Sequence, residues 1–284
     1  MAGRNRSSIT YDAPPLVEVA MSIQFDPPNG LNQAHLGAFW VTQKHELPRV
    51  RALQPITASY DDFGGERQWL PPSLQLALTN EPDCRLQMIS LDDQWVCQVQ
   101  RNRLVLNWRK RSEGYPRFSA AWDRFLTAWE AWPAFLVDYQ LEGIRSRLWE
   151  LTYVNRIPND RLWEKPSDWP NVFPGLWGGG FSVVEGAELR GFQGRWVWES
   201  LDPPAHLYVE PNPGRSAEDP LRDVLLLSLT ARGVIREDNR TGKPSQSDLI
   251  ECAMAFGHDW IVDTFDKITS DSAKKAWGRH VDSE

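Results

Sequence analysis

Large apolar residues recur at helical spacing in the stretch from Tyr115 to Phe135. They follow intervals of four, three, four and three residues and are Phe118, Trp122, Phe125, Trp129 and Trp132. That rhythm places all five aromatic side chains on one face of an α-helix. Because each of them buries about 150–250 Å², the face requires a broad apolar partner, which we expect the rest of the chain to supply.

A second long helix is predicted over Gln246–Ile268 from the same kind of spacing. Its apolar stripe consists of Ile250, Met254, Gly257, Ile261, Phe265 and Ile268. Ser247 or Asp248 is the expected N-cap, because their side-chain oxygens accept hydrogen bonds from the free amides of a first helical turn. A shorter amphipathic helix is predicted over Gln33–Leu47, and Ser270 is expected to cap a short last helix.

Alternation of apolar and polar residues predicts the strands. They are Leu16–Phe25, Leu74–Thr79, Arg85–Leu91, Trp95–Gln100, Leu104–Trp108, Tyr139–Ile157, Phe181–Glu188, Phe192–Ser200, Ala205–Glu210 and Val224–Arg232. Short turns at hairpin distance separate several of them, which indicates an antiparallel meander. Pro133 is expected to close or bend the first long helix. Residues 48–72 are expected to form a long loop, with or without a short strand inside it. Residues 158–180 are expected to be irregular, apart from a helical turn or two near Asp160–Glu164.

The order of these elements predicts an α+β fold, in which long helices pack on one face of one or two antiparallel sheets. Each half of the chain contains a strand, a helical or irregular segment, a meander and a long helix, so we predict a helix-grip-like pseudo-repeat. The expected halves are residues 14–137 and 138–284, after a mobile arm over residues 1–13. They form either one continuous domain or two lobes.

Composition narrows the possible function. The net charge of −7 argues against a nucleic-acid binder that works through bulk electrostatics. The 3 cysteines contain no CxxC pair, so they indicate neither a zinc site nor a disulfide framework. The sequence has no run of about 18 apolar residues and no secretory signal. We therefore expect a cytoplasmic protein that is not bound to a membrane.

Three segments resemble a family of sporadically distributed prokaryotic proteins of similar length. They are Pro14–Val19 with the following Gln24-Phe25, Leu151–Ile157, and Ala255–His258 with the following Phe265 and Ile268-Thr269. The resemblance implies a prokaryotic protein, and the sporadic distribution suits a role in defence or mobile elements. It implies no activity, because the family has no established catalytic residues to carry over.

Motifs for catalysis or cofactor binding are missing from the sequence. None of the 5 histidines has HxxxH or HExxH spacing. Gly178-Gly179-Gly180 lacks the Lys and Ser/Thr of a phosphate-binding loop, and no G-x-S-x-G elbow occurs. We therefore assign no catalytic residue, no metal ligand and no cofactor.

Three residues are candidates for ligand binding. His258 lies beside the broad apolar face of the second long helix, where an imidazole can contact a ligand. Arg156 and Asn155 stand at the end of an apolar strand, and an arginine there suits a carboxylate or phosphate. The alternatives are a histidine that hydrogen-bonds locally at the helix edge and an arginine in a surface ion pair.

Trp163, Trp169 and Trp177 lie in the proline-rich irregular segment. They either cover one end of the core or form an exposed aromatic patch for a protein partner, since Trp is enriched at binding hot spots.

Three functions follow as hypotheses. The first is a non-enzymatic protein-binding or regulatory component, whose partner is another protein encoded nearby. The alternative is a small-molecule binder or enzyme with a cavity between the long helices and the sheet, where His258 and Arg156 contact the ligand. The third is a nucleic-acid-binding accessory protein, which requires a basic concave face in spite of the acidic net charge. No oligomeric state follows from the sequence.

Overall fold

The computed structural model describes residues 9–59, 61, 63, 83–111, 114–178, 187–216, 219, 222–235 and 245–281. Its helices and strands are, in chain order, β1 (Ile9–Tyr11), β2 (Leu16–Phe25), α1 (Gln33–Gln43), β3 (Arg49–Leu53), β4 (Arg85–Ile89), β5 (Trp95–Gln100), β6 (Arg103–Arg109), α2 (Arg117–Asp138), β7 (Ser146–Pro158), the 3-10 helix η1 (Pro166–Asp168), α3 (Trp169–Val172), α4 (Pro174–Trp177), β8 (Trp196–Leu201), β9 (Pro204–Arg215), β10 (Asp223–Val234), α5 (Gln246–Ile268), α6 (Asp271–Ala276) and β11 (Arg279–Val281). The predicted strand Leu74–Thr79 and most of Phe181–Glu188 lie outside the described residues.

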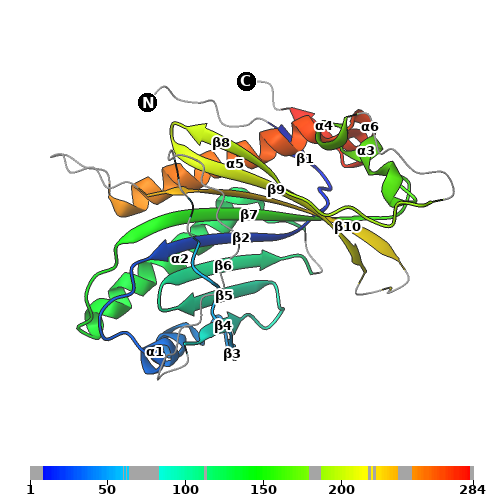
Figure 1. The fold of residues 1–284 in the computed structure, drawn as a ribbon. Coiled ribbons are helices and arrows are strands. Elements are labelled where there is room, and N and C mark those ends of the chain that lie inside the picture. Colours follow the sequence, from blue (N-terminus) through cyan, green and yellow to red (C-terminus); the bar gives the residue numbers. More distant parts are fainter. Residues whose placement is uncertain are drawn as a thin grey trace.

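Within the described residues, one antiparallel sheet of nine strands has the order β3-β4-β5-β6-β2-β7-β10-β9-β8 (Figure 1). β2 pairs with β7 inside this sheet, and each of them has one strand of a meander, β6 or β10, on its other side. The α+β class with antiparallel strands and long helices is therefore confirmed.

The two long helices cover the same face of the sheet. Phe25 of β2 contacts Trp129 of α2, with ring centroids 6.2 Å apart. Trp149 of β7 is paired with Ile23 of β2, and Ile23 and Phe25 lie on the same side of β2. Trp149 therefore lies on the same face as Phe25, where it contacts α5 at Gly257. Of the predicted aromatic face of α2, Trp122, Phe125, Trp129 and Trp132 are buried and Phe118 is partly buried.

α5 approaches β7 closely because the contact point is a glycine. A Cβ atom added at Gly257 would lie 2.6 Å from Cζ3 of Trp149, well inside van der Waals contact. The indole of Trp149 is itself 2% exposed, so it has no free space to move into. The glycine inside the apolar stripe of α5 thus brings the helix down onto the sheet and fixes the position of the neighbouring His258.

Two details of the long helices differ from the predictions. Of the two alternatives for Pro133, closure of the helix was wrong, because α2 continues to Asp138. Phe135 and Leu136 beyond the proline are buried, and this burial offsets the backbone hydrogen bond that the proline removes. α5 is capped by Ser245 rather than by Ser247 or Asp248, and Ser245 and Asp248 form a reciprocal capping box.

The predicted mobile arm over residues 1–13 is partly wrong, although residues 1–8 lie outside the described part. Ile9–Tyr11 form β1, which pairs with β11 at the other end of the chain. The buried Tyr11 hydroxyl donates a 2.8 Å hydrogen bond to Asp266 of α5. Arg279 of β11 donates to the same carboxylate through Nε and Nη2, so one aspartate holds both strands against α5.

Other boundaries also differ from the predictions. The first helix ends at Gln43 instead of Leu47, and the strand expected over Tyr139–Ile157 begins only at Ser146. The helical turns of the irregular segment lie at η1, α3 and α4, after the predicted Asp160–Glu164. β9 continues past Glu210 to Arg215, through two prolines.

The opposite face of the sheet is polar. Arg232 of β10 forms ion pairs with Glu150 at 2.5 Å and with Asp61 at 2.7 Å, and all three side chains are largely buried. Residues 54–59 and Asp61 lie over this face, on the side of the β3 edge. The side-chain amide of Gln100 bonds both backbone groups of Ile56, and that of Gln24 does the same for Ser59. We call residues 54–59 together with Asp61 the strap.

Candidate functional site

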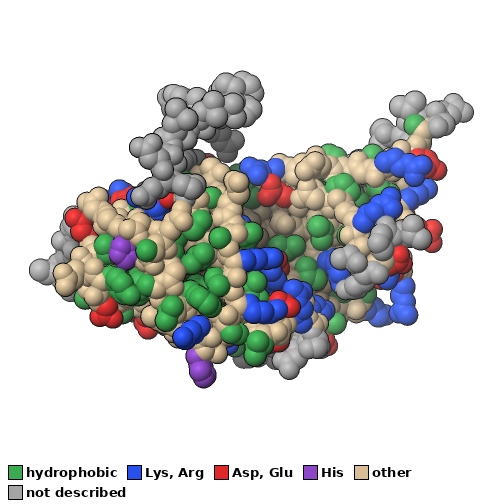
Figure 2. Space-filling view, turned by 90° about the horizontal axis from the view of Figure 1, so that it is seen from below, with side chains coloured by type: hydrophobic (Ala, Val, Ile, Leu, Met, Phe, Trp, Pro, Cys, Tyr) green, Lys and Arg blue, Asp and Glu red, His purple; other side chains and the backbone are tan. Residues whose placement is uncertain are grey.

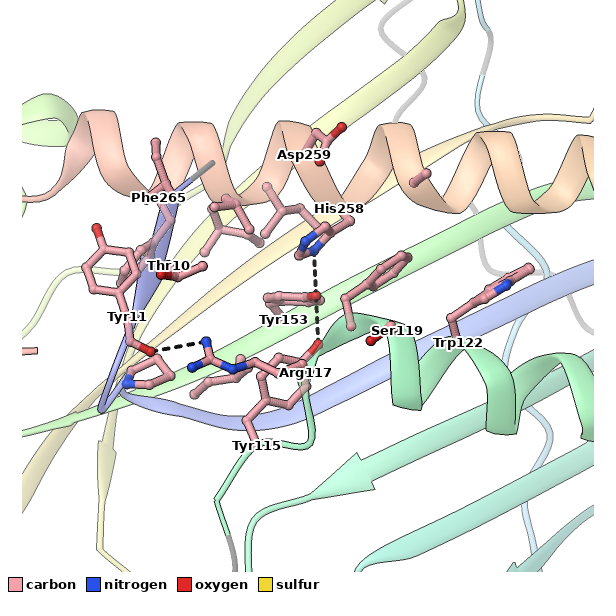
Figure 3. A pocket seen from close by; sticks show the side chains of 18 of the residues that line it. Thr10, Tyr11, Tyr115, Arg117, Ser119, Trp122, Tyr153, His258, Asp259 and Phe265 are labelled. Atoms are coloured by element: carbon pink, nitrogen blue, oxygen red, sulfur yellow. Dashed lines mark hydrogen bonds between the residues drawn. The ribbon is translucent and has the colours of Figure 1, made fainter. Parts of the chain in front are cut away.

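A cavity of about 480 Å³ lies between the long helices and the sheet (Figure 3). α5 and the first turns of α2 form its sides, β1 closes one end, and side chains of β2, β7 and β10 form its floor. Its walls are mostly apolar, and residues such as Leu16, Ile261, Val262 and Phe265 line it. The aromatic face of α2 therefore packs on the sheet through most of its length and meets an open space only at its N-terminal end.

Three side chains from different elements form a hydrogen-bonded chain at the cavity wall. The hydroxyl groups of Tyr115 and Tyr153 are 3.0 Å apart. The Tyr153 hydroxyl is also 2.8 Å from Nδ1 of His258. Tyr115 precedes α2, Tyr153 lies on β7 and His258 lies on α5, so the chain joins both helices to the sheet (Figure 3).

Both tyrosines keep their protons at neutral pH. Burial raises the pKa of both tyrosines, and the nearby hydroxyl of Tyr115 and negative charge of Asp259 also raise the pKa of Tyr153. A protonated phenol is a neutral group that both donates and accepts a hydrogen bond. The pair can therefore bind a polar atom of a ligand without adding charge to the cavity.

Stacking fixes the orientation of the imidazole. The rings of Phe118 and His258 lie 4.2 Å apart and nearly parallel, at 8°. Phe118 is on the first turn of α2, so this contact joins the two long helices directly. Since Nδ1 of His258 is held by Tyr153 and one ring face is covered by Phe118, the imidazole is held in a single orientation at the cavity wall.

Arg117, the first residue of α2, lies on the wall opposite α5 and has an unusual backbone. Its φ of 72° falls in the left-handed region, which side chains other than glycine adopt at a cost. Its guanidinium donates to the backbone carbonyl of Tyr11 at 3.4 Å, and no carboxylate of the described residues forms an ion pair with it. No side chain caps this end of α2.

The structure separates the ligand-binding residues that the sequence suggested. His258 and Asn155 line the cavity. Asn155 is buried, and its amide donates to the carbonyl of Leu227. Arg156 follows Asn155 on the same strand and does not line the cavity. Neighbouring strand residues point to opposite faces, so Asn155 and Arg156 do not meet at this cavity, and ligand binding by Arg156 stays a prediction.

Tyr115, Tyr153 and Arg117 were missed. Tyr153 lies two residues before Asn155 and therefore on the same face of β7, which the alternation of the strand was sufficient to reveal. Tyr115 and Arg117 flank Pro116 at the start of a long helix, and no local pattern distinguishes them from ordinary helix-entry residues.

The tryptophans of the irregular segment cover the core. Trp163 and Trp169 are 2% and 1% exposed, with ring centroids 5.8 Å apart. Trp177 is partly buried and contacts Trp169, Phe192 and Trp196. Of the two interpretations of these tryptophans, the structure favours core cover, because Trp163 and Trp169 present almost no surface to a partner.

Basic and acidic side chains are interspersed on the side of the molecule that Figure 2 shows, although several Lys and Arg side chains gather near its middle. Ion pairs occur along the first meander, such as Arg49 with Asp93 and Arg109 with Glu18. This mixture offers little support for a basic nucleic-acid-binding face.

Searches against protein-family models, curated proteins and solved structures found no match. The family resemblance of the sequence therefore stays a prediction. Among the described residues, no cluster of three or more His, Cys, Asp or Glu side chains is suited to hold a metal ion. None of the helices in this part of the chain has the length and apolar character needed to cross a membrane.

Proposed function

We propose that the chain binds a small, largely apolar organic molecule in the cavity between α2, α5 and β1. The observation that carries this proposal is the cavity itself, about 480 Å³ with mainly apolar walls and a few convergent polar groups. Ligand pockets typically measure about 300–1,000 Å³ and have this composition. The Tyr115–Tyr153–His258 chain would orient the ligand through hydrogen bonds.

The protein-binding hypothesis has less support, because Trp163 and Trp169 of the proposed aromatic patch are buried. It stays a prediction, as does a role in defence or mobile elements. Nucleic-acid binding has less support, since some arginines of the first meander, such as Arg49 and Arg109, form ion pairs with acidic neighbours.

We also propose that the two halves of the chain are a helix-grip-like pseudo-repeat. The symmetry of strand order supports it: β2 and β7 pair with each other, and β6 and β10 lie beside them. α2 follows β6, and α5 follows β10. In this view the cavity lies where the two halves meet, and both halves are needed to form its walls.

A neutral fluorescent probe tests the proposed binding. N-phenyl-1-naphthylamine gains fluorescence in apolar surroundings, and we expect it to bind the wild-type chain at one site. Ala255→Trp places an indole inside the cavity, because Ala255 lines it, and should abolish the signal. Ala134→Trp is the matched control, because Ala134 is exposed on α2 and the substitution should leave binding unchanged.

Thermal melting of both variants shows whether they fold. The proposal fails if the wild-type chain does not bind the probe, or if folded Ala255→Trp protein binds it as well as wild type does.

A further inference from the structure

We infer that the cavity is selective for an amphiphilic acid, whose carboxylate is held by Arg117 and whose apolar body lies along α5. This inference rests on the proposed function and specifies the class of its ligand.

The first argument is the uneven distribution of charge around the cavity. Arg117 stands at the end closed by β1, since its guanidinium bonds the carbonyl of Tyr11. Asp123 and Glu251 line the other end. Asp123 is six residues along α2 from Arg117, which corresponds to about 9 Å of helix. Glu251 is seven residues before His258, about 10 Å along α5. An acid would therefore be attracted to one end and repelled from the other.

The second argument is that Arg117 has no carboxylate partner. Its one hydrogen bond in the described structure goes to a neutral carbonyl at 3.4 Å. In this respect it differs from Arg232, which binds two carboxylates on the opposite face of the sheet. Arginine binds carboxylates through two parallel hydrogen bonds, and most of its donors are available for this.

The Tyr115 hydroxyl supplies the neighbouring donor. Burial has the largest effect on the pKa of this phenol and raises it, whereas the positive charge of Arg117 acts to lower it. Asp259 acts in the opposite sense at Tyr153, where its negative charge helps to raise the pKa. The acid group therefore belongs beside Arg117 and Tyr115, and not beside Tyr153 and Asp259.

The backbone of Arg117 gives a third argument. A left-handed φ at a residue other than glycine, asparagine or aspartate costs free energy and concentrates at functional sites. With φ at 72°, the chain turns sharply after Tyr115 and Pro116 and brings both the arginine and the phenol to the same cavity. The apolar wall beyond them, with Val262 and Phe265, suits the body of the ligand.

Three probes that share a decyl chain test the inference. Decanoate, decanol and decylamine carry a negative, a neutral and a positive head group at neutral pH. Each is titrated below its micelle concentration against wild-type protein loaded with N-phenyl-1-naphthylamine, and displacement gives the affinity. We expect decanoate to bind most tightly, decanol next and decylamine most weakly.

Variants locate the selectivity. Arg117→Gln should weaken the binding of decanoate about tenfold, because a hydrogen bond to a charged group is lost. The affinity for decanol should stay within about twofold of the wild-type value. Arg117→Lys should restore part of the affinity. Arg111→Gln removes an equal charge at an exposed position outside the cavity and should change nothing.

The outcomes separate the two proposals. Three results would each overturn the acid selectivity and leave the cavity as a binding site. They are equal affinities for decanoate and decanol, a higher affinity for decylamine than for decanoate, and decanoate binding that Arg117→Gln does not change. Failure of the neutral naphthylamine to bind the wild-type chain would remove the proposed function and this inference with it. Unchanged naphthylamine affinity in Arg117→Gln would show that the variant keeps its cavity.

Discussion

The two faces of the large sheet are built from the same strands but have opposite chemistry. On the helix-covered face, alternate residues such as Trp149 and Tyr153 of β7 meet the aromatic side chains of α2 and α5. On the open face, the residues between them, such as Glu150 and Thr152, join a polar network under the strap. Side chains alternate along a strand, so each strand contributes to a hydrocarbon interior and to a charged surface at once.

This difference shows where each kind of function can reside. The helix face excludes water, and a polar group there, such as the Tyr115–Tyr153 hydroxyl pair, becomes a specific binding element. On the open face, Arg232 binds both Glu150 and Asp61, so these three charges are satisfied within the fold. A candidate ligand site is therefore found on the apolar face, even though the open face holds more charged groups.

Trp132→Ala should have the largest effect on stability. Trp132 is 0% exposed and contacts Phe25, Phe39 and Phe135, so its removal leaves a large cavity. We expect a loss of about 3–5 kcal/mol in the free energy of unfolding, measured by urea denaturation. Trp198→Ala on the β8 edge is the control, since Trp198 is 37% exposed, and it should cost less than about 1 kcal/mol. Equal losses would contradict the contrast between core and edge.

Arg232→Met should have the next largest effect, because it leaves Asp61 without an ion-pair partner among the described residues and Glu150 with only its 3.7 Å pair to Arg103. Breaking a buried pair costs about 3–5 kcal/mol, and partial solvent access here reduces this to about 2–3 kcal/mol. The double variant Arg232→Met, Asp61→Asn removes one charge of each sign and leaves Glu150 to Arg103, so it should recover most of the loss in the free energy of unfolding. If it is no more stable than Arg232→Met, the loss comes from the missing hydrogen bonds and not from the unpaired charge of Asp61.

Asp266 sharpens the comparison, because it is a buried charged group on the helix side. Burial alone would raise its pKa, but hydrogen bonds from Arg279 and Tyr11 outweigh burial and hold the pKa below its usual value. A carboxyl with a lowered folded-state pKa stabilises the fold above its unfolded pKa of about 3.9. That contribution is lost as the pH falls through the folded value.

We therefore expect wild type to exceed Asp266→Asn in stability by about 1–2 kcal/mol near neutral pH. The difference should shrink as the pH falls below about 4. Thermal melts of both proteins between pH 7 and pH 3 measure it. A difference that stays constant over this range would mean that hydrogen bonding of the neutral side chain, and not its charge, holds β1 and β11.

Much of the fold was predictable because its strongest signals are local. The bounds of β2, β5 and α5 agree with their predictions, since apolar periodicity and flanking turn residues define them. β9 was predicted too short because Pro211 and Pro213 argue against a strand. They are tolerated because β8 pairs with β9 only up to Val209, so the proline segment is an edge.

The site was less predictable, because its walls come from segments far apart in sequence. His258 and Asn155 were identified from their positions on apolar elements, and both line the cavity. Tyr115 and Arg117 gain their roles only from the distance between α2 and β1, which no local pattern encodes. Arg156 does not line the cavity, because its side chain lies on the opposite face of β7 from Tyr153 and Asn155.

The pairing of β1 with β11 brings together two segments that are far apart in the sequence, since Ile9 pairs with Val281. The long loop between them must close before this contact forms, and contacts of such long sequence separation form late in folding. Because residues of β1 line one end of the cavity, the binding site is completed only at this late step. A molecule in which β1 and β11 separate would keep its nine-stranded sheet and lose one wall of the cavity.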